Sequence, residues 1–208
     1  MNERGNVIIA VIVGLVVGLG AGYLAANSKA SPTAMKETAT QRESQGLSAS
    51  ADPEAKIKNA ASAAPENIAK DATVLDYPTA EGKDFATLRA GTNGWTCLPD
   101  DPSSPANDPV CVDKEGMNFF QAWMTKAKPK LAQAGIGYML QGGGSASNSD
   151  PFATKPADGE MWMHEPPHLM VFTTTPPDAK IYSTDPNSGG PWVMWAGTPY
   201  AHLMIPVK

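Results

Sequence analysis

The pattern of hydrophobic and polar positions divides the chain into three parts. Residues 7–26 form an uncharged apolar run of 20 residues. Residues 27–70 are rich in Ala, Ser, Thr, Lys and Glu and contain no aromatic side chain. All five tryptophans lie in residues 71–208, among frequent prolines and glycines. We therefore expect an N-terminal membrane anchor or signal peptide at 1–26, a flexible linker at 27–70 and a globular domain at 71–208.

The apolar run at residues 7–26 is long enough to cross a lipid bilayer. As an α-helix it would span roughly 30 Å, the thickness of the hydrocarbon core. The alternative is a cleaved signal peptide, because Ser-Lys-Ala at 28–30 suits a cleavage site, although signal sequences usually have a shorter apolar run. Gly14, Gly18 and Gly22 share one helix face, which favours helix–helix self-association, although glycine is common in membrane spans generally.

Within the globular part the pattern predicts one clear helix and several short strands. Apolar residues recur at helical spacing between residues 115 and 128, and Pro129 ends the run. A marginal helix is also expected to start at Asp52-Pro53-Glu54 and to reach about residue 64. The predicted strands are residues 72–77, 85–89, 94–98, 136–140, 169–174, 192–195 and 202–207. The fold class is therefore α+β, a single compact loop-rich domain with a mainly antiparallel sheet, after an N-terminal transmembrane helix.

A short internal repeat links two of these strands. His-Leu-Met occurs at 168–170 and again at 202–204, and each triplet follows an Asp-Pro pair and a tryptophan. Two similar loop-and-strand units would pack as neighbours, while chance similarity is the alternative for so short a match.

Charge and cysteine content restrict the partners and the compartment. Residues 71–208 contain 9 Lys and Arg against 15 Asp and Glu, so the basic face that nucleic acid requires is lacking. Cys97 and Cys111 are the only cysteines. Behind an export signal this pair predicts a disulfide, with two buried reduced thiols as the alternative.

The expected location is the bacterial inner membrane, with the C-terminal domain in the periplasm. Lys29, Lys36 and Arg42 follow the apolar run, and a count of positive charges would keep that side in the cytoplasm. The predicted disulfide favours the opposite orientation. A secreted protein, released after signal cleavage, is the alternative.

Several segments of the domain resemble a group of uncharacterised exported bacterial proteins. They are Gly-Thr-Asn-Gly-Trp-Thr-Cys at 91–97, Tyr-Met-Leu at 138–140, Pro-His-Leu-Met at 167–170 and Thr-Pro-Tyr-Ala-His-Leu-Met at 198–204. The group has no established activity. The resemblance implies export and carries over no site residue.

The two His-Leu-Met strands supply a candidate metal site. Alternate side chains of a strand share a face, so His168 lies beside Met170, and His202 beside Met204. Imidazole and thioether ligands suit copper, especially Cu(I). The alternative is a strand pair buried on both faces, in which methionines fill gaps and the histidines bond to the backbone.

Aromatic and hydroxyl side chains supply two further candidate sites. Trp162, Trp192, Trp195 and Tyr200 could line a ligand-binding cleft, and core packing explains them equally well. A hydrolase would use a serine at 145 or 147, with one of the two histidines oriented by Asp150 or Asp185. No catalytic motif supports that set: the Gly-rich segment at 142–145 matches neither a nucleophile elbow nor a phosphate loop.

The last candidate site is a set of carboxylates close to the cysteines in the sequence. Asp100, Asp101, Asp108 and Asp113 could bind calcium through oxygen, although they lack EF-hand spacing, and a solvated acidic loop is the alternative. The leading functional hypothesis is thus a membrane-tethered extracytoplasmic binding or interaction module without catalysis. A copper-binding or other metal-binding envelope protein and an envelope hydrolase are the alternatives.

Overall fold

The computed structural model describes residues 52–79 and 84–207, all of which belong to one compact unit. The apolar run at 7–26, its three spaced glycines and the linker up to residue 51 lie outside these residues. None of the helices in the described part has the length and apolar character needed to span a membrane. The anchor, its self-association and the linker up to residue 51 therefore stay predictions.

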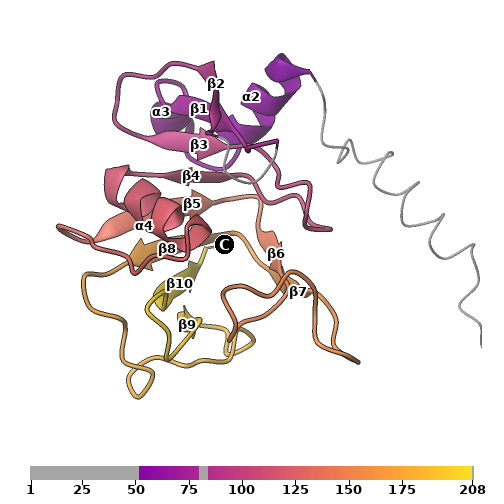
Figure 1. The fold of residues 1–208 in the computed structure, drawn as a ribbon, viewed down its shortest axis with the longest axis vertical. Coiled ribbons are helices and arrows are strands. Elements are labelled where there is room, and N and C mark those ends of the chain that lie inside the picture. Colours follow the sequence, from indigo (N-terminus) through magenta and orange to yellow (C-terminus); the bar gives the residue numbers. More distant parts are fainter. Residues whose placement is uncertain (1–51, 80–83, 208) are drawn as a thin grey trace, which may run out of the picture. The chain divides into compact units, whose positions relative to one another are not determined.

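An eight-stranded sheet runs through the domain (Figure 1). In sheet order its strands are β2 (Ala86–Arg89), β1 (Thr73–Asp76), β3 (Thr96–Leu98), β4 (Val110–Val112), β5 (Gly135–Met139), β8 (His168–Phe172), β10 (His202–Pro206) and β9 (Trp192–Met194). The pair β1–β3 is parallel and the other pairs are antiparallel. A separate antiparallel pair is formed by β6 (Gly143–Ser145) and β7 (Met163–Glu165). The expectation of a sheet-rich domain with few helices and a mostly antiparallel sheet is confirmed.

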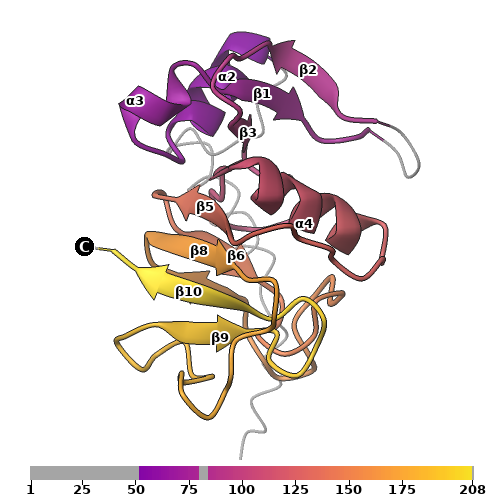
Figure 2. The same ribbon diagram turned by 90° about the vertical axis from the view of Figure 1, so that its left-hand side faces the viewer.

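The helices cover the two faces of this sheet. Helices α2 (Pro53–Ala61) and α3 (Glu66–Ala69) contribute buried alanines to a cluster that contains Val74, Cys97 and Cys111. Helix α4 (Lys114–Met124) packs on the opposite face, where Val112, Phe119 and Phe172 belong to the larger core (Figure 2). The sulfur atoms of Cys97 and Cys111, which face each other across β3 and β4, are 2.10 Å apart, so the predicted disulfide is confirmed.

Residues 52–70, which the sequence analysis places in the linker, are folded onto the sheet. Asp52 caps α2 by accepting a hydrogen bond from Glu54 N, as the sequence indicates. Asn59 then connects the helix to the loop between β3 and β4 by accepting a hydrogen bond from Asp100 N at 2.7 Å. Lys56 forms a 2.6 Å ion pair with Asp76. The segment has few large apolar side chains, but its small alanines pack closely against the sheet and are buried there.

Helix α4 ends earlier than the sequence predicts. Its start is set by Asp113, whose side chain accepts from Gly116 N at 2.8 Å. At the other end Lys126 has a left-handed backbone with φ 56°. Lys126 N donates to Trp123 O, and the next amide donates to Ala122 O, which is a Schellman arrangement. The helix therefore stops at Met124, before Pro129 is reached.

The two His-Leu-Met strands are neighbours, as the internal repeat predicts. Strand β8 pairs with β10 so that Met170 lies opposite Met204. Seven strands were placed correctly to within a few residues, whereas β4, β6 and β7 were missed. Each missed strand has three residues, which is too few to show an alternating pattern.

Candidate functional site

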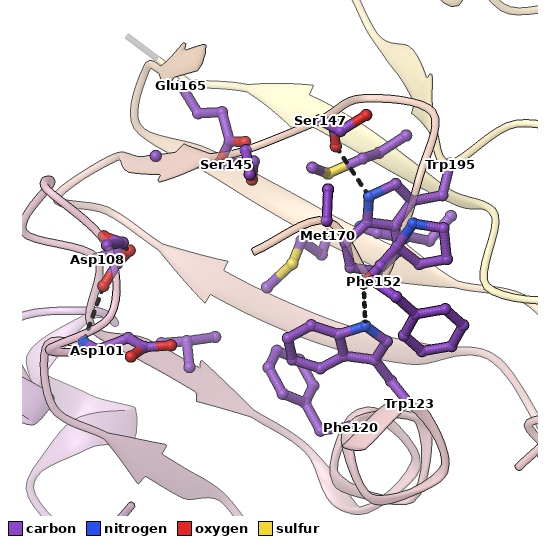
Figure 3. Close-up of a pocket in the computed structure, with 18 of the residues that line it drawn as sticks. Asp101, Asp108, Phe120, Trp123, Ser145, Ser147, Phe152, Glu165, Met170 and Trp195 are labelled. Atoms are coloured by element: carbon purple, nitrogen blue, oxygen red, sulfur yellow. Dashed lines mark hydrogen bonds between the residues drawn. The ribbon is translucent and has the colours of Figure 1, made fainter. Parts of the chain in front are cut away.

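A cavity of about 440 Å³ lies on the α4 face of the sheet (Figure 3). Its floor comes from the central and C-terminal strands, where Met170, Met194 and Met204 supply thioethers. Helix α4 forms one wall. The remaining walls come from the loop between β3 and β4 and from residues 144–154. Pockets of several hundred Å³ are typical of small-molecule sites.

Two tryptophans form the aromatic end of the cavity. Trp123 of α4 and Trp195, next after β9, stack with ring centroids 5.5 Å apart and an interplanar angle of 26°. Both indole N–H groups donate to the same wall segment, Trp123 to Pro151 O at 2.7 Å and Trp195 to Ser147 O at 3.1 Å. The rings are therefore fixed in position, and both line the cavity.

The backbone at this end of the cavity is strained. Trp195 and Lys126 have φ values of 55° and 56°, and no other non-glycine residue in the described part has a positive φ. The left-handed conformation costs roughly 1–2 kcal/mol for a residue with a side chain. Both residues line the cavity. Strain of this kind often occurs at binding and catalytic sites, so the φ value of Trp195, which no helix end explains, makes the cavity the candidate site.

Carboxyl groups form the opposite end of the cavity. Figure 3 shows Asp101, Asp108 and Glu165 on one side and Trp123 and Trp195 on the other.

Asp108 is 7% exposed and receives two hydrogen bonds, from Ser104 Oγ at 2.5 Å and from Asp101 N at 2.9 Å. Burial raises its pKa from 3.8 to about 7, against the opposing effect of these hydrogen bonds. The interpretation of this segment as a solvated acidic loop is therefore wrong for Asp108.

Glu165 is the more deeply buried carboxyl, at 3% exposure on β7. Burial raises its pKa, and a hydrogen bond from Ser145 opposes that rise. Its Oε1 atom is buried without a hydrogen-bond partner in the structure. A buried oxygen without a partner costs roughly 1–3 kcal/mol. One carboxyl oxygen of this cavity-lining residue is therefore enclosed and has no hydrogen-bond partner in the described part of the chain.

The four residues of the predicted metal site are spread along the strand pair. The two methionines are direct partners, but His168 pairs with Pro206, at the other end of β10 from His202. Both imidazoles bond to the backbone through Nδ1, His168 to Pro166 O at 2.7 Å and His202 to Tyr200 O at 2.9 Å.

Burial lowers the pKa of both histidines, that of His202 to about 4, so both are neutral at pH 7. His168 Nε2 is buried without a partner in the structure. No cluster of three or more His, Cys, Asp or Glu suited to a metal ion occurs in residues 52–79 and 84–207. Copper binding stays a prediction.

The four aromatic residues predicted to line a cleft divide into two pairs. Trp162 and Trp195 line the cavity. Trp192 is fully buried among core residues, and its Nε1 atom has no partner in the structure. Tyr200 is buried as well, with its hydroxyl donating to Ala127 O at 2.9 Å. Core packing, the alternative interpretation, describes the second pair.

The hydroxyls and carboxylates of the hydrolase alternative have local structural roles. Ser147 Oγ accepts from the backbone N–H groups of Ser149 and Asp150, which forms a turn. Asp150 accepts from Phe152 N, and Asp185 from Asn187 N, as turn-starting aspartates do. His202 lines the cavity, and its ring Nδ1 bonds to the backbone oxygen of Tyr200.

Three residues that shape the cavity were not predicted in this role. Trp123 lies within the predicted helix, beside its apolar stripe, where helical periodicity gives no sign of a binding site. Glu165 stands between a histidine and two prolines, where no motif identifies it. Asp108 was included in a candidate calcium loop, so its carboxylate-rich surroundings were the one signal available. No match to the chain was found among protein-family models, curated proteins or solved structures.

Proposed function

We propose that this domain is a non-catalytic binding module that holds a small molecule in the cavity. The stacked pair of Trp123 and Trp195 carries the proposal, because two indoles whose N–H groups are already bonded offer carbon faces at low entropic cost. The strained backbone of Trp195 supports it. So does Glu165, whose Oε1 has no partner within the protein part described.

The module is tethered outside the cytoplasm in this proposal. Residues 7–26 anchor it in the inner membrane, and the domain stands in the periplasm; secretion after signal cleavage is the alternative arrangement. The disulfide supports either arrangement, because such bonds persist in oxidising compartments. The ligand would then be a molecule of the periplasm or of the surrounding medium.

Indole tests the proposal as a neutral aromatic probe. Full-length protein in a neutral maltoside detergent is titrated with indole, and binding is followed by calorimetry and by ligand-observed NMR. Wild-type protein is expected to bind indole, and Trp123→Leu to bind it about tenfold more weakly, since a stacking partner contributes roughly 1 kcal/mol or more.

A matched variant controls for loss of a tryptophan. Trp95 lies against Tyr138 in a tilted arrangement, with ring centroids 5.4 Å apart, and packs with the cluster on the opposite face of the sheet. Trp95→Leu should therefore bind indole as the wild type does. Circular dichroism establishes that both variants are folded. Absence of indole binding to the wild type, or equal binding by the folded Trp123→Leu variant, would contradict the proposal.

A further inference from the structure

We propose that the floor of the cavity contains a binding site for Cu(I), formed by one imidazole and three thioethers. The four residues are His202, Met170, Met194 and Met204. This inference goes beyond the proposed function, because it concerns a metal ion on the floor of the cavity and not a small molecule between its walls. Its basis is the register of three neighbouring strands and the chemistry of the side chains that the register brings together.

The register of β9, β10 and β8 places these four side chains next to one another. His202 lies opposite Met194 in the β10–β9 pair. Met204, two residues further along β10, lies opposite Met170 of β8. Direct partners and residues two apart share one face of a sheet, and all four residues line the cavity. The side chains of direct partners start about 5 Å apart and those of diagonal neighbours about 7–8 Å apart, which a long methionine side chain can span.

The imidazole of His202 is held in the tautomer that a metal ion requires. Its Nδ1 atom lies 2.9 Å from the backbone oxygen of Tyr200. Because a carbonyl oxygen only accepts hydrogen bonds, Nδ1 carries the proton and Nε2 carries the lone pair. Burial lowers the pKa of the ring to about 4, so the ring is neutral at pH 7. Metal-binding histidines typically donate their other ring nitrogen in this way, which fixes the orientation of the ring.

The other histidine of the internal repeat is not part of this site. His168 does not line the cavity, and its Nε2 atom is enclosed by the protein. It also lies at the far end of the strand pair from His202, opposite Pro206. Met194 takes its place in the set of donors, since it faces His202 directly and lines the cavity.

The donor set favours Cu(I) over other biological metal ions. Imidazole and thioether groups are uncharged and suit this ion, whereas zinc and calcium sites use thiolate or carboxylate ligands. No thiolate competes for the ion, because the two cysteines of the chain are joined in the disulfide. The rings of Phe119, Phe172 and Trp195 surround His202, with centroids between 5.1 and 5.4 Å from its own. Such an apolar shell limits the access of water to a bound metal, and an ion with a single charge is the least costly to bury there.

Competition with a chelator tests the site. Full-length protein in neutral detergent is mixed anaerobically with the coloured Cu(I) complex of bicinchoninate in the presence of ascorbate. Loss of the colour reports the transfer of Cu(I) to the protein. The wild type is expected to take up a single Cu(I) ion per chain and to leave Zn(II) in solution when that ion is offered instead. Tryptophan emission should fall in proportion to the uptake, since Trp195 lies against His202.

Replacement of two thioethers by leucine distinguishes a metal site from core packing. The variant Met194→Leu with Met204→Leu keeps the apolar volume nearly constant and should bind Cu(I) about tenfold or more weakly. The matched control is Met161→Leu with His164→Gln, because both residues are exposed and lie outside the cavity lining. This control should bind Cu(I) as the wild type does. Circular dichroism establishes that both variants are folded.

Three outcomes would overturn the inference. They are failure of the wild type to take Cu(I) from the chelator, unchanged Cu(I) affinity in the folded double leucine variant, and loss of Cu(I) binding in the surface control. The proposed function is judged separately by indole binding. A wild type that binds indole and no Cu(I) contradicts this inference alone, and one that binds Cu(I) and no indole contradicts the proposed function alone.

Discussion

The contribution of two buried carboxyls, Asp108 and Glu165, to the stability of the folded domain should fall as the pH rises from about 5 to about 8. The buried His168 and His202, whose pKa values burial lowers, act in the opposite direction below about pH 6.5, so the carboxyl effect is isolated by comparing variants with the wild type. Burial raises the pKa of Asp108 from 3.8 to about 7, and it raises that of Glu165 as well. In the unfolded chain both groups lose their protons near pH 4. The folded state therefore binds more protons than the unfolded state between these limits. The stabilisation that protonated Asp108 provides is complete below about pH 4 and is lost as the pH rises through about 7.

The size of the effect follows from the pKa of Asp108. Each pH unit over which the folded state alone holds the proton corresponds to about 1.4 kcal/mol. For Asp108 the loss reaches on the order of 4 kcal/mol by pH 8, and Glu165 acts in the same direction. A domain is typically stable by about 5–15 kcal/mol, so the loss is a large fraction of the total.

Urea unfolding of the full-length protein in neutral detergent is followed by tryptophan fluorescence at several pH values. It measures how the free energy of unfolding changes with pH. Asp108→Asn is the informative variant, since an asparagine can still accept from Asp101 N and can donate to Ser104 Oγ. It should be more stable than the wild type at pH 8, and its stability should fall less between pH 5 and pH 8 than that of the wild type, because the contribution of Asp108 is removed. Glu160→Gln, on the surface, should follow the wild type. An Asp108→Asn variant that is no more stable than the wild type at pH 8, or whose stability changes with pH as that of the wild type does, would refute the reasoning.

Two further predictions concern stability. Replacing both Cys97 and Cys111 by alanine should lower the free energy of unfolding by about 3 kcal/mol, as expected for a loop of this length; equal urea midpoints with and without the bond would contradict this. Gly135→Ala should cost about 1–3 kcal/mol, because its added carbon would lie 2.6 Å from Gly116 N and force α4 away from β5. Gly190→Ala, which meets nothing within 4 Å, serves as the control in thermal unfolding, and similar losses in both variants would argue against close helix–strand contact.

The parts of the fold that could be predicted are those with local signals. The start of α2 follows from Asp52 and Pro53, and the longer strands follow from alternation of apolar residues. The end of α4 could not be predicted, because a lysine rather than a glycine takes the left-handed position at 126. Docking of residues 52–70 also escaped prediction, since alanine adds little apolar area and its contribution depends on how closely the sheet approaches.

The candidate site was predicted only in part for a similar reason. Trp195 was identified because aromatic residues commonly line clefts, whereas Glu165 and Asp108 acquire their properties from burial by distant segments. The strands β6 and β7 bring Glu165 beside Gly143, and the pair spans residues that lie far apart in the sequence. Periodicity reports on one element at a time, so it contains no information about such long-range juxtapositions.

The position of α2 and α3 over the disulfide has a kinetic consequence. Both cysteines are 0% exposed, beneath the buried alanines of these helices. Thiol–disulfide exchange needs direct attack on a sulfur atom, so a reductant can react only when the helices detach. When this local opening is slow, its rate sets the rate of reduction in native buffer. When opening is fast, the rate of reduction is proportional to the population of the open state. The susceptibility of the disulfide to reduction consequently reports whether α2 and α3 are packed against the sheet.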